Sequence, residues 1–450
     1  MSAPITNVGY MPIIRAPANQ VDTIYTVLLR CKKIAEKLGQ YETVVTFDEA
    51  LYCKAKELVW ANPEQLSSVV VRLGGFHIAK NFLGVIGKHM EKSGLCDVLV
   101  ESNVFNESTA QSILAGKSWN RAVRAHKLLF EALMRLLLEG FRTWHDRNDK
   151  ESYNSLCCET LNLAATFNMN GSELIKHFQV ALQSWKIKVK EFSSDMKDYL
   201  DENRSNLTFS FWKGYMDMVQ LLLLFLRAER EGNWLLHLDT MKEMLPWMAI
   251  YDHTNYMRLG VIYMADMIHL EQTAPNVHRE FLEGNFVVKE ANGTFNQVHT
   301  DMALEHVNKL CKVAGGIVGI TRNKPALDRW MLSCCDLSRL VEDVCDMVGI
   351  SVESSQTQKD LGEKRIIKDE DDVNELLKQL QEFRPFERDT KELICISTND
   401  VASQSIANDL LTAQERGKDI LKAFVQTRLG KDATVQFHST IRKNKSKTFA

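Results

Sequence analysis

Two side chains suited to acid–base or metal chemistry follow two short β-branched segments. Asp48 comes directly after Val44–Phe47, and His77 comes shortly after Val69–Leu73, behind a pair of glycines. Each segment leads into a helical pattern, so strand, helix, strand and helix follow one another at the spacing of a right-handed crossover with two neighbouring parallel strands. Because chemistry in open α/β sheets gathers at the carboxyl ends of the strands, we expect both side chains at one edge of a sheet.

Each of these two residues has a structural interpretation beside the functional one. An aspartate that opens a helix commonly acts as an N-cap for free backbone amides, and Asp48 fits that role. It also fits a metal ligand, because Mg²⁺ and Mn²⁺ bind one or two carboxylates together with substrate phosphates. His77 lies beside the apolar helix positions Phe76 and Phe82, where a packed histidine and a catalytic histidine are both compatible with the pattern.

Glu305 is the third candidate. Helical spacing over Thr300–Val313 places Asp301, Glu305, Lys309 and Lys312 on one polar flank, with Thr300 as the N-cap. This flank is either a solvated surface with a Glu305–Lys309 pair, or a metal-binding carboxylate with two lysines that contact phosphates.

Established metal and phosphate motifs are missing from the sequence. His299 and His306 are separated by a spacing that matches no metal-ligand pattern, so we expect both to be solvated. The ten cysteines contain no CxxC pair, which favours reduced thiols. A Gly315-Gly316 bend lacks the GK[ST] ending of a phosphate loop.

The elements that would position these residues suggest an α+β fold that is predominantly helical. Val21–Leu38 has amphipathic helical spacing, no convincing strand occurs between residues 95 and 283, and 285–298 resembles a hairpin. The predicted parts are 1–94, an N-terminal sheet-containing segment; 95–283, an all-helical block; 284–350, a second sheet-containing segment with the acidic helix; 351–368, a polar linker; and 369–450, a helical region with a basic tail.

Composition and charge exclude several classes of protein. The net charge of −3 and the 45% apolar content are those of an ordinary globular protein, so any nucleic-acid surface has to be a local patch. The N-terminus lacks the layout of a secretion signal, and the apolar run Leu221–Leu226 is too short to span a membrane. We expect a nuclear or cytoplasmic protein that is neither secreted nor membrane-bound.

Two local patches carry basic side chains. Helical spacing groups Arg121, Arg124, His126 and Lys127 into a polar stripe. The segment 431–450 contains five Lys or Arg and one Asp. Together with the two lysines of the 300–313 flank, these patches give the candidate nucleic-acid contacts Arg121, Arg124, Lys127, Lys309, Lys312, Arg442, Lys443 and Lys445.

Three motifs resemble those of DDE transposases with an RNase H-like fold, particularly the Mutator-like group. TFDEAL at 46–51 resembles the aspartate motif at a strand end, and GGFH at 74–77 resembles the histidine motif. TDMALEHVNK at 300–309 is similar to the last catalytic helix, and the helical block 95–283 falls where that family carries its insertion. Residues 5–350 also resemble a group of uncharacterised transposon-borne proteins of animal genomes, through VRLGGFHIAKNFLGVIG, AGKSWNRAVRAHKLL and EGNFVVKEANGTFNQVHTDMALEHVNKL.

This resemblance implies a partial RNase H-like sheet core and metal-dependent DNA strand cleavage and transfer. Asp48 and Glu305 would hold Mg²⁺ or Mn²⁺ at one edge of a single small sheet, and His77 would position substrate or a carboxylate. The family's first catalytic aspartate has no counterpart before Asp48, and Gly74 stands where the histidine motif carries Cys or Asp. The chain is therefore expected to be a shortened copy, or to complete its site differently, and to be weak or inactive as an enzyme.

The alternative is a non-enzymatic helical module that binds DNA or partner proteins, including a second copy of itself. The basic tail and the Arg121–Lys127 stripe would carry that function. No cofactor motif supports a metabolic enzyme.

Overall fold

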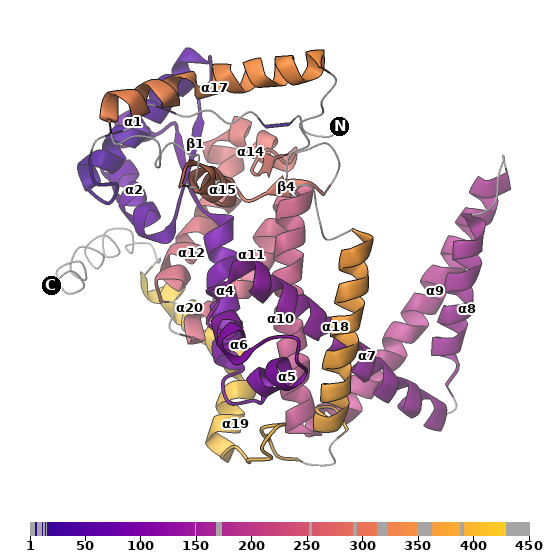
Figure 1. Ribbon diagram of the computed structural model, residues 1–450. Helices are drawn as coiled ribbons and strands as arrows, with labels where there is room; N and C mark the ends of the chain where they lie inside the picture. The colour runs from indigo at the N-terminus through magenta and orange to yellow at the C-terminus, as the bar shows by residue number, and fades with distance from the viewer. Residues whose placement is uncertain are drawn as a thin grey trace. The chain divides into compact units, whose positions relative to one another are not determined.

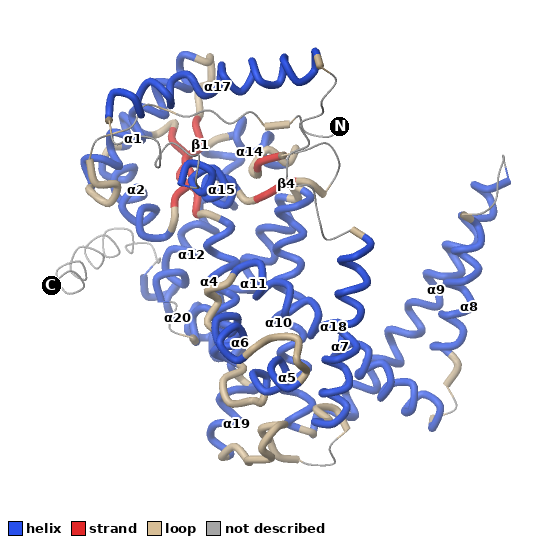
Figure 2. Tube along the Cα trace, in the orientation of Figure 1, coloured by secondary structure: helices blue, strands red, loops and turns tan. Residues whose placement is uncertain are grey.

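The structure is a computed structural model that describes residues 5–6, 11, 14, 16–148, 150–167, 173–251, 254–290, 295–312, 323–348, 362–387 and 391–428. The chain divides into two compact units. The first comprises Met1–Val85, Leu221–Ile366 and Ala413–Ala450, and the second Ile86–Gln220 and Ile367–Thr412. Helices dominate and strands are few (Figure 2), which confirms the predicted predominantly helical α+β class.

The first unit contains all the strands of the described chain. Its elements are α1 (Val21–Lys37), β1 (Thr43–Phe47), α2 (Glu49–Ala61), α3 (Pro63–Leu66), β2 (Val69–Leu73), the beginning of α4 (Gly75–His89), the end of α10 (Leu207–Glu231), α11 (Trp234–Ile250), α12 (Thr254–Ile268), α13 (Leu270–Thr273), α14 (Pro275–Leu282), β3 (Val288–Lys289), β4 (Gln297–Val298), α15 (Thr300–Lys312), α17 (Lys324–Met347) and α20 (Ala413–Arg428).

The predicted crossover is present. Strands β1 and β2 are parallel and in register from Thr43 opposite Val69 to Phe47 opposite Leu73, with α2 in the connection between them. The β-branched composition of both strands suits a pleated surface that is buried on one side. Val45 faces the interior, as Leu73 does at the end of β2. The sheet therefore delivers the ends of both strands to one edge.

The predicted hairpin is also present, but it forms a sheet of its own. Val288 pairs with Val298 in antiparallel β3 and β4, and within the described residues this ladder does not join β1 or β2. The expectation of a single sheet is therefore wrong for the described chain. A side chain makes the connection instead: buried Arg72 of β2 donates a hydrogen bond to the backbone oxygen of Phe286, just before β3.

Aromatic packing fills the interior of the first unit around the start of α11. The Trp234 ring lies 4.7 Å from that of Phe281 and 5.0 Å from that of Phe286, measured between centroids. Arg72 lies over both phenylalanine rings as a cation–π partner. Helix α20 approaches α11 so closely that a Cβ on Gly417 would lie 2.1 Å from the carbonyl oxygen of Pro246.

Within the described residues, the regular elements of the second unit are helices, and the expected absence of strands holds for the described part of 95–283, of which residues 221–283 belong to the first unit. It contains the end of α4, α5 (Leu95–Glu101), α6 (Glu107–Leu114), α7 (Trp119–Arg147), α8 (Ser152–Thr166), α9 (Glu173–Glu202), the short 3₁₀ turn Asn203–Ser205, the beginning of α10, most of α18 (Glu363–Phe383) and α19 (Gln404–Leu411). Ala125, Leu129, Leu133 and Leu136 are buried at helical spacing and form the inner face of α7.

Three local predictions need correction. Helix α18 begins at Glu363, so the predicted linker is helical over 363–368, where EKRIIK contains several good helix formers, while 351–361 lie outside the described residues. The strand expected at Leu393–Ser397 is only an isolated bridge between Ile394 and Val401. Thr300 is the first helical residue of α15 and not its N-cap, and its hydroxyl donates to the backbone oxygen of Phe286 (3.1 Å).

In the described ranges, no helix is both long and apolar enough to cross a membrane.

Candidate functional site

The start of α15 is joined to the start of α4 through Asp301. Asp301 Oδ1 accepts a hydrogen bond from the backbone amide of Phe76 (3.0 Å), and Oδ2 accepts one from the amide of His77 (3.1 Å). Oδ2 also lies 2.9 Å from the imidazole Nδ1 of His77. In Figure 1, α15 lies beside β1, in agreement with its contacts. The carboxylate therefore satisfies two of the orphan amides at the α4 N-terminus and orients the imidazole.

The two glycines before His77 make this close approach possible. A Cβ on Gly74 would lie 2.2 Å from Oδ2 of Asp301, and a Cβ on Gly75 would lie 2.8 Å from Nδ1 of His299. Both distances are shorter than any van der Waals contact. The Gly-Gly pair is needed here for close packing and not for a positive φ.

The Asp301–His77 pair changes the protonation of both partners. The hydrogen bond that His77 donates to Asp301 raises the pKa of His77 above its ordinary value of 6.5, against the opposing effect of partial burial. Burial would raise the pKa of Asp301, but the hydrogen bonds from His77 and the charge of His299 outweigh it and lower that pKa. Because the His77 side chain is 28% exposed, it can exchange protons with solvent or with a bound molecule.

Asp48 has the structural role that its position predicted. Its Oδ1 accepts a hydrogen bond from the backbone amide of Leu51 (2.9 Å), which makes it the N-cap of α2. Asp48 follows Phe47, whose backbone oxygen accepts a hydrogen bond from the amide of Gly74 (2.9 Å), so Asp48 and the glycine pair before His77 lie at the same end of the β1–β2 sheet. The negative charge of Asp48 contributes to the raised pKa of His77. Burial, and then the charge of Asp48, raise the pKa of Glu49 as well. The edge of the β1–β2 sheet thus gathers negative charge around one imidazole.

Glu305 is placed differently from the expectation. It lies one helical turn after Asp301 and is exposed, and the acidic residue of α15 that contacts His77 is Asp301. The first turn of α15 faces the free amides of α4, and Asp301 is the acidic residue in that turn. Sequence spacing placed both residues on one flank but could not decide which of them meets the histidine.

The donor set does not fit an Mg²⁺ or Mn²⁺ centre. Asp301 already accepts hydrogen bonds at both oxygens, and one oxygen of Asp48 caps α2. Among the described residues, no three His, Cys, Asp or Glu side chains gather as potential metal ligands. A hard cation needs several oxygen ligands converging on one point, so no metal-dependent step follows from this geometry.

A second polar cluster is buried behind the glycine pair. Glu229 near the end of α10 is 1% exposed, and its Oε1 lies 2.5 Å from Nδ1 of His237 while its Oε2 lies 3.0 Å from Nδ1 of His299. The other ring nitrogen of His237 lies 2.9 Å from the hydroxyl of Tyr263. Burial would raise the pKa of Glu229, but the two histidines outweigh burial and hold it well below its usual range. The carboxylate is therefore charged inside the protein.

This cluster corrects one expectation and reveals residues that the motif search missed. His299 is buried, not solvated, whereas His306 is partly exposed and lies 3.6 Å from Glu290. Glu229 and His237 belong to no motif. A signal was nevertheless present: Glu229 follows Phe225 by four residues, so helical periodicity puts a carboxylate on the apolar face of α10.

Of the side chains predicted to contact nucleic acid, some are exposed and others are buried or paired with carboxylates. Arg121 and Lys127 are exposed on α7. Arg124 is half-buried and pairs with Asp369 and Asp372, which corrects the expectation of a free basic side chain. His126 of the same stripe is buried, its Nδ1 lies 2.8 Å from the hydroxyl of Tyr215, and burial lowers its pKa to about 4. The other five positions lie outside the described residues. This applies to the side chains of Lys309 and Lys312 and to the whole of Arg442, Lys443 and Lys445.

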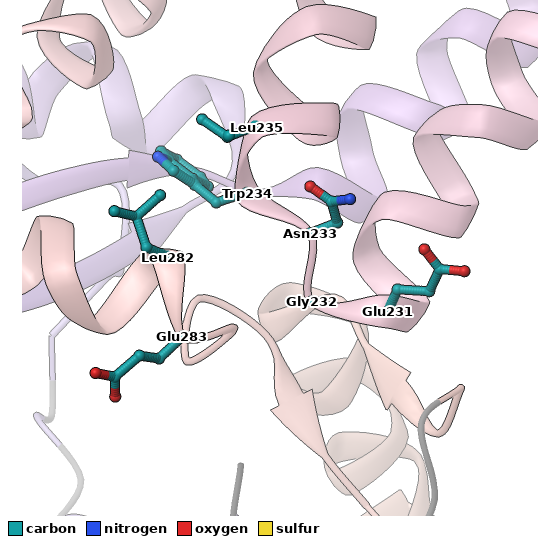
Figure 3. A pocket seen from close by; sticks show the side chains of 7 residues that line it. All are labelled: Glu231, Gly232, Asn233, Trp234, Leu235, Leu282 and Glu283. Carbon is teal, nitrogen blue, oxygen red and sulfur yellow. The ribbon is translucent and has the colours of Figure 1, made fainter. Parts of the chain in front are cut away.

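A pocket of about 360 Å³ lies elsewhere in the first unit, where α10 ends, α11 begins and α14 ends (Figure 3). Its walls combine the exposed side chains of Leu235 and Leu282 with the carboxylates of Glu231 and Glu283. It holds no histidine or cysteine. The pocket is therefore separate from the Asp301–His77 site in chemistry as well as in its lining.

Comparison with known proteins adds a family but no function. The model of a family described as "Domain of unknown function (DUF8702)" matches residues 1–450. No curated protein and no solved structure matches the chain. A match over the whole length shows that the chain belongs to the DUF8702 family.

Proposed function

We propose that this protein derives from a DNA-cleaving transposase, binds DNA, and has weak or no strand-cleaving activity of its own. The observation that carries the proposal is the meeting of the aspartate, histidine and acidic-helix motifs around one imidazole. Asp301 and His77 are 224 residues apart in the chain and still form a direct contact. Asp48, from the aspartate motif, follows the strand end Phe47, whose backbone oxygen accepts a hydrogen bond from the amide of Gly74, three residues before His77.

The order of these parts supports the descent. A strand that ends in an aspartate, a glycine-preceded histidine, a helical block and an acidic helix follow one another as the resemblance to Mutator-like transposases implies. Segments so distant in sequence meet at the carboxyl ends of two strands for one of two reasons: because they form a functional site, or because packing alone brings them together. Three polar side chains at such an edge favour the first explanation, since packing alone is satisfied by apolar residues.

The prediction of weak activity is supported by how the carboxylates are used. Two-metal cleavage of a phosphodiester needs carboxylates that hold both ions close together. Asp301 is occupied by the α4 amides and His77, Asp48 caps α2, and Glu305 lies a turn away from the histidine.

The test uses the purified full chain with supercoiled plasmid and either Mg²⁺ or Mn²⁺. We expect salt-sensitive DNA binding, and nicking that is no faster than that of the Asp48→Ala variant. Nicking that depends on Mn²⁺ and disappears in Asp48→Ala would show a working enzyme and overturn the inactive part of the proposal. Absence of DNA binding at low salt would overturn the relation to DNA itself.

A second candidate function, binding of a partner protein or of another copy, is favoured by exposed apolar side chains on α8 and α9. Leu161, Val180 and Ile187 are 71%, 72% and 57% exposed. Val180 and Ile187 are seven residues apart and share one face of α9, and an exposed apolar face commonly marks an interaction site. Light scattering after size exclusion tests self-association: we expect a mass that falls towards one chain in Val180→Ser/Ile187→Ser, and a monomer at all concentrations would argue against this candidate.

A further inference from the structure

In the second unit, an acidic helix occupies the basic face of α7. Nε and Nη2 of Arg124 donate to Oδ1 of Asp369 (2.9 and 2.5 Å), and Nη2 also donates to Asp372. Further along, Nη1 and Nη2 of Arg135 donate to the two oxygens of Glu370 (2.8 and 2.7 Å). All three carboxylates belong to α18, which lies beside α7 in Figure 1.

These contacts use the donor geometry with which arginine binds phosphate. The planar guanidinium presents two parallel N–H groups that match two oxygens of a carboxylate or of a phosphate equally well. Residues 369, 370 and 372 present a row of anionic oxygens along one helical turn, as a nucleic-acid backbone presents a row of phosphates. Exposed Arg121 lies one turn before Arg124 on α7, and exposed Lys127 lies between Arg124 and Arg135.

We propose that the beginning of α18 is an intramolecular acidic cover over a DNA-binding face of α7, and that the phosphate backbone of duplex DNA competes with it for Arg124 and Arg135. This inference rests on the proposed relation to DNA and adds to it the site and its regulation. In the structure, the carboxylates of α18 occupy the two arginines. When DNA displaces the beginning of α18, its phosphates contact four basic side chains of α7: Arg121, Arg124, Lys127 and Arg135.

The way α18 is anchored makes such an exchange possible. Val373, Leu376 and Leu380 are at most 1% exposed and hold the later turns of the helix in place. The acidic contacts come before this anchor, and two of the three carboxylates are open to water: the side chains of Asp369 and Glu370 are 31% and 50% exposed, and that of Asp372, next to the anchor, is 18% exposed. Ion pairs at such positions are screened by salt and individually weak, so a dense array of phosphates can replace them.

The test compares two variants of the full chain with the same change in charge. Asp369→Asn, Glu370→Gln and Asp372→Asn together remove the carboxylates that face α7. Asp371→Asn, Glu375→Gln and Glu382→Gln remove three exposed carboxylates of the same helix that have no contact with α7 among those described. Affinity for a fluorescent DNA duplex is measured by anisotropy over a range of salt concentrations.

We expect the first variant to bind DNA about ten-fold more tightly than the unmodified protein. Its plot of log affinity against log salt should be steeper by roughly two, because each phosphate contact adds about 0.9 to the slope and two arginines are released. The control variant should keep the original slope. Adding Arg124→Gln and Arg135→Gln to the first variant should abolish the gain.

Each other outcome has a definite meaning. If both variants bind with the same affinity and slope, the cover is rejected while DNA binding stands. If no form binds DNA, the proposed function fails, and the inference with it. A gain that survives loss of the two arginines places binding elsewhere and overturns the inference.

Should the first variant not fold, hydrogen exchange on the unmodified protein provides the answer. Saturating DNA should then increase exchange in residues 363–372 and slow it in α7, and unchanged exchange at the start of α18 overturns the proposal.

Discussion

Asp301 Oδ2 lies 2.9 Å from Nδ1 of His77, and the same carboxylate accepts the backbone amides of Phe76 and His77. One buried side chain thus caps α4, orients an imidazole and fixes the first turn of α15. The following predictions test how much of the first unit depends on this relationship and on the buried cluster beside it.

Asp301→Asn should destabilise the protein by roughly 2 kcal/mol, because hydrogen bonds to a charged group are lost and an amide nitrogen faces backbone donors. It should also lower the pKa of His77, since the hydrogen bond that His77 donates to the Asp301 carboxylate is the largest cause of its raised value. Urea unfolding and NMR titration of His77 measure both effects. Glu305→Gln, one turn further on, is the matched control and should change stability by less than about 0.5 kcal/mol; equal effects would show that Asp301 has no special role.

The Asp301–His77 pair should give stability a defined dependence on pH. Asp301 has a pKa below 3.8 in the folded protein, so its contribution is present above that pH and is lost as the pH falls. His77 has a pKa raised above 6.5, so its contribution is complete below that pH and is lost as the pH rises through the raised value. The stability difference between the unmodified protein and His77→Gln should therefore be larger near pH 5.5 than near pH 8.5. A difference that is constant over this range would contradict the coupling.

Two substitutions separate the effect of Asp48 as the N-cap of α2 from the effect of its negative charge on His77. Asp48→Ala should cost about 1 kcal/mol of stability, because the Leu51 amide loses its acceptor. Asp48→Asn keeps an acceptor at the N-cap and should cost only a few tenths of a kcal/mol. Both variants should lower the pKa of His77, since both remove the neighbouring negative charge. Equal destabilisation by the two variants would mean that charge, not capping, is the main contribution of Asp48.

The buried carboxylate Glu229 should be far more important for stability than the partly exposed carboxylate of Glu231. Glu229→Gln leaves His237 and His299 without their anion and should cost about 3 kcal/mol or more, as expected when one partner of a buried ion pair is removed. Glu231→Gln breaks only the surface pair with Arg227 and should cost less than about 1 kcal/mol. Thermal unfolding of the two variants, measured side by side, distinguishes these outcomes; similar losses would argue against a charged buried cluster.

Two glycines, one just before α4 and one inside it, provide a test of close packing. Gly74→Ala should destabilise by about 1–3 kcal/mol, because its Cβ would lie 2.2 Å from Asp301. Gly84 lies in the interior of α4 with nothing within 4 Å of its Cβ, so Gly84→Ala should stabilise by about 0.5–1 kcal/mol. Denaturant unfolding measures both. A neutral Gly74→Ala would mean that Asp301 moves aside freely and that its contact with His77 is not tightly held.

The sequence alone determined the local elements of this protein. The β-branched runs before Asp48 and before the glycine pair became parallel strands, and the long apolar periodicities became α7, α9, α10 and α11. These features depend on neighbouring residues and on side-chain periodicity, which a sequence displays directly. For the same reason the N-cap role of Asp48 was readable in advance.

Only the tertiary structure decided which polar groups meet. Three contacts join residues from distant segments. Asp301, and not Glu305, meets His77; His299 is buried against Glu229; and Arg124 pairs with α18. Helical spacing assigns a side chain to a face but does not say what that face packs against. A buried charge survives only where a distant partner compensates it, and that partner becomes visible only when the chain is folded.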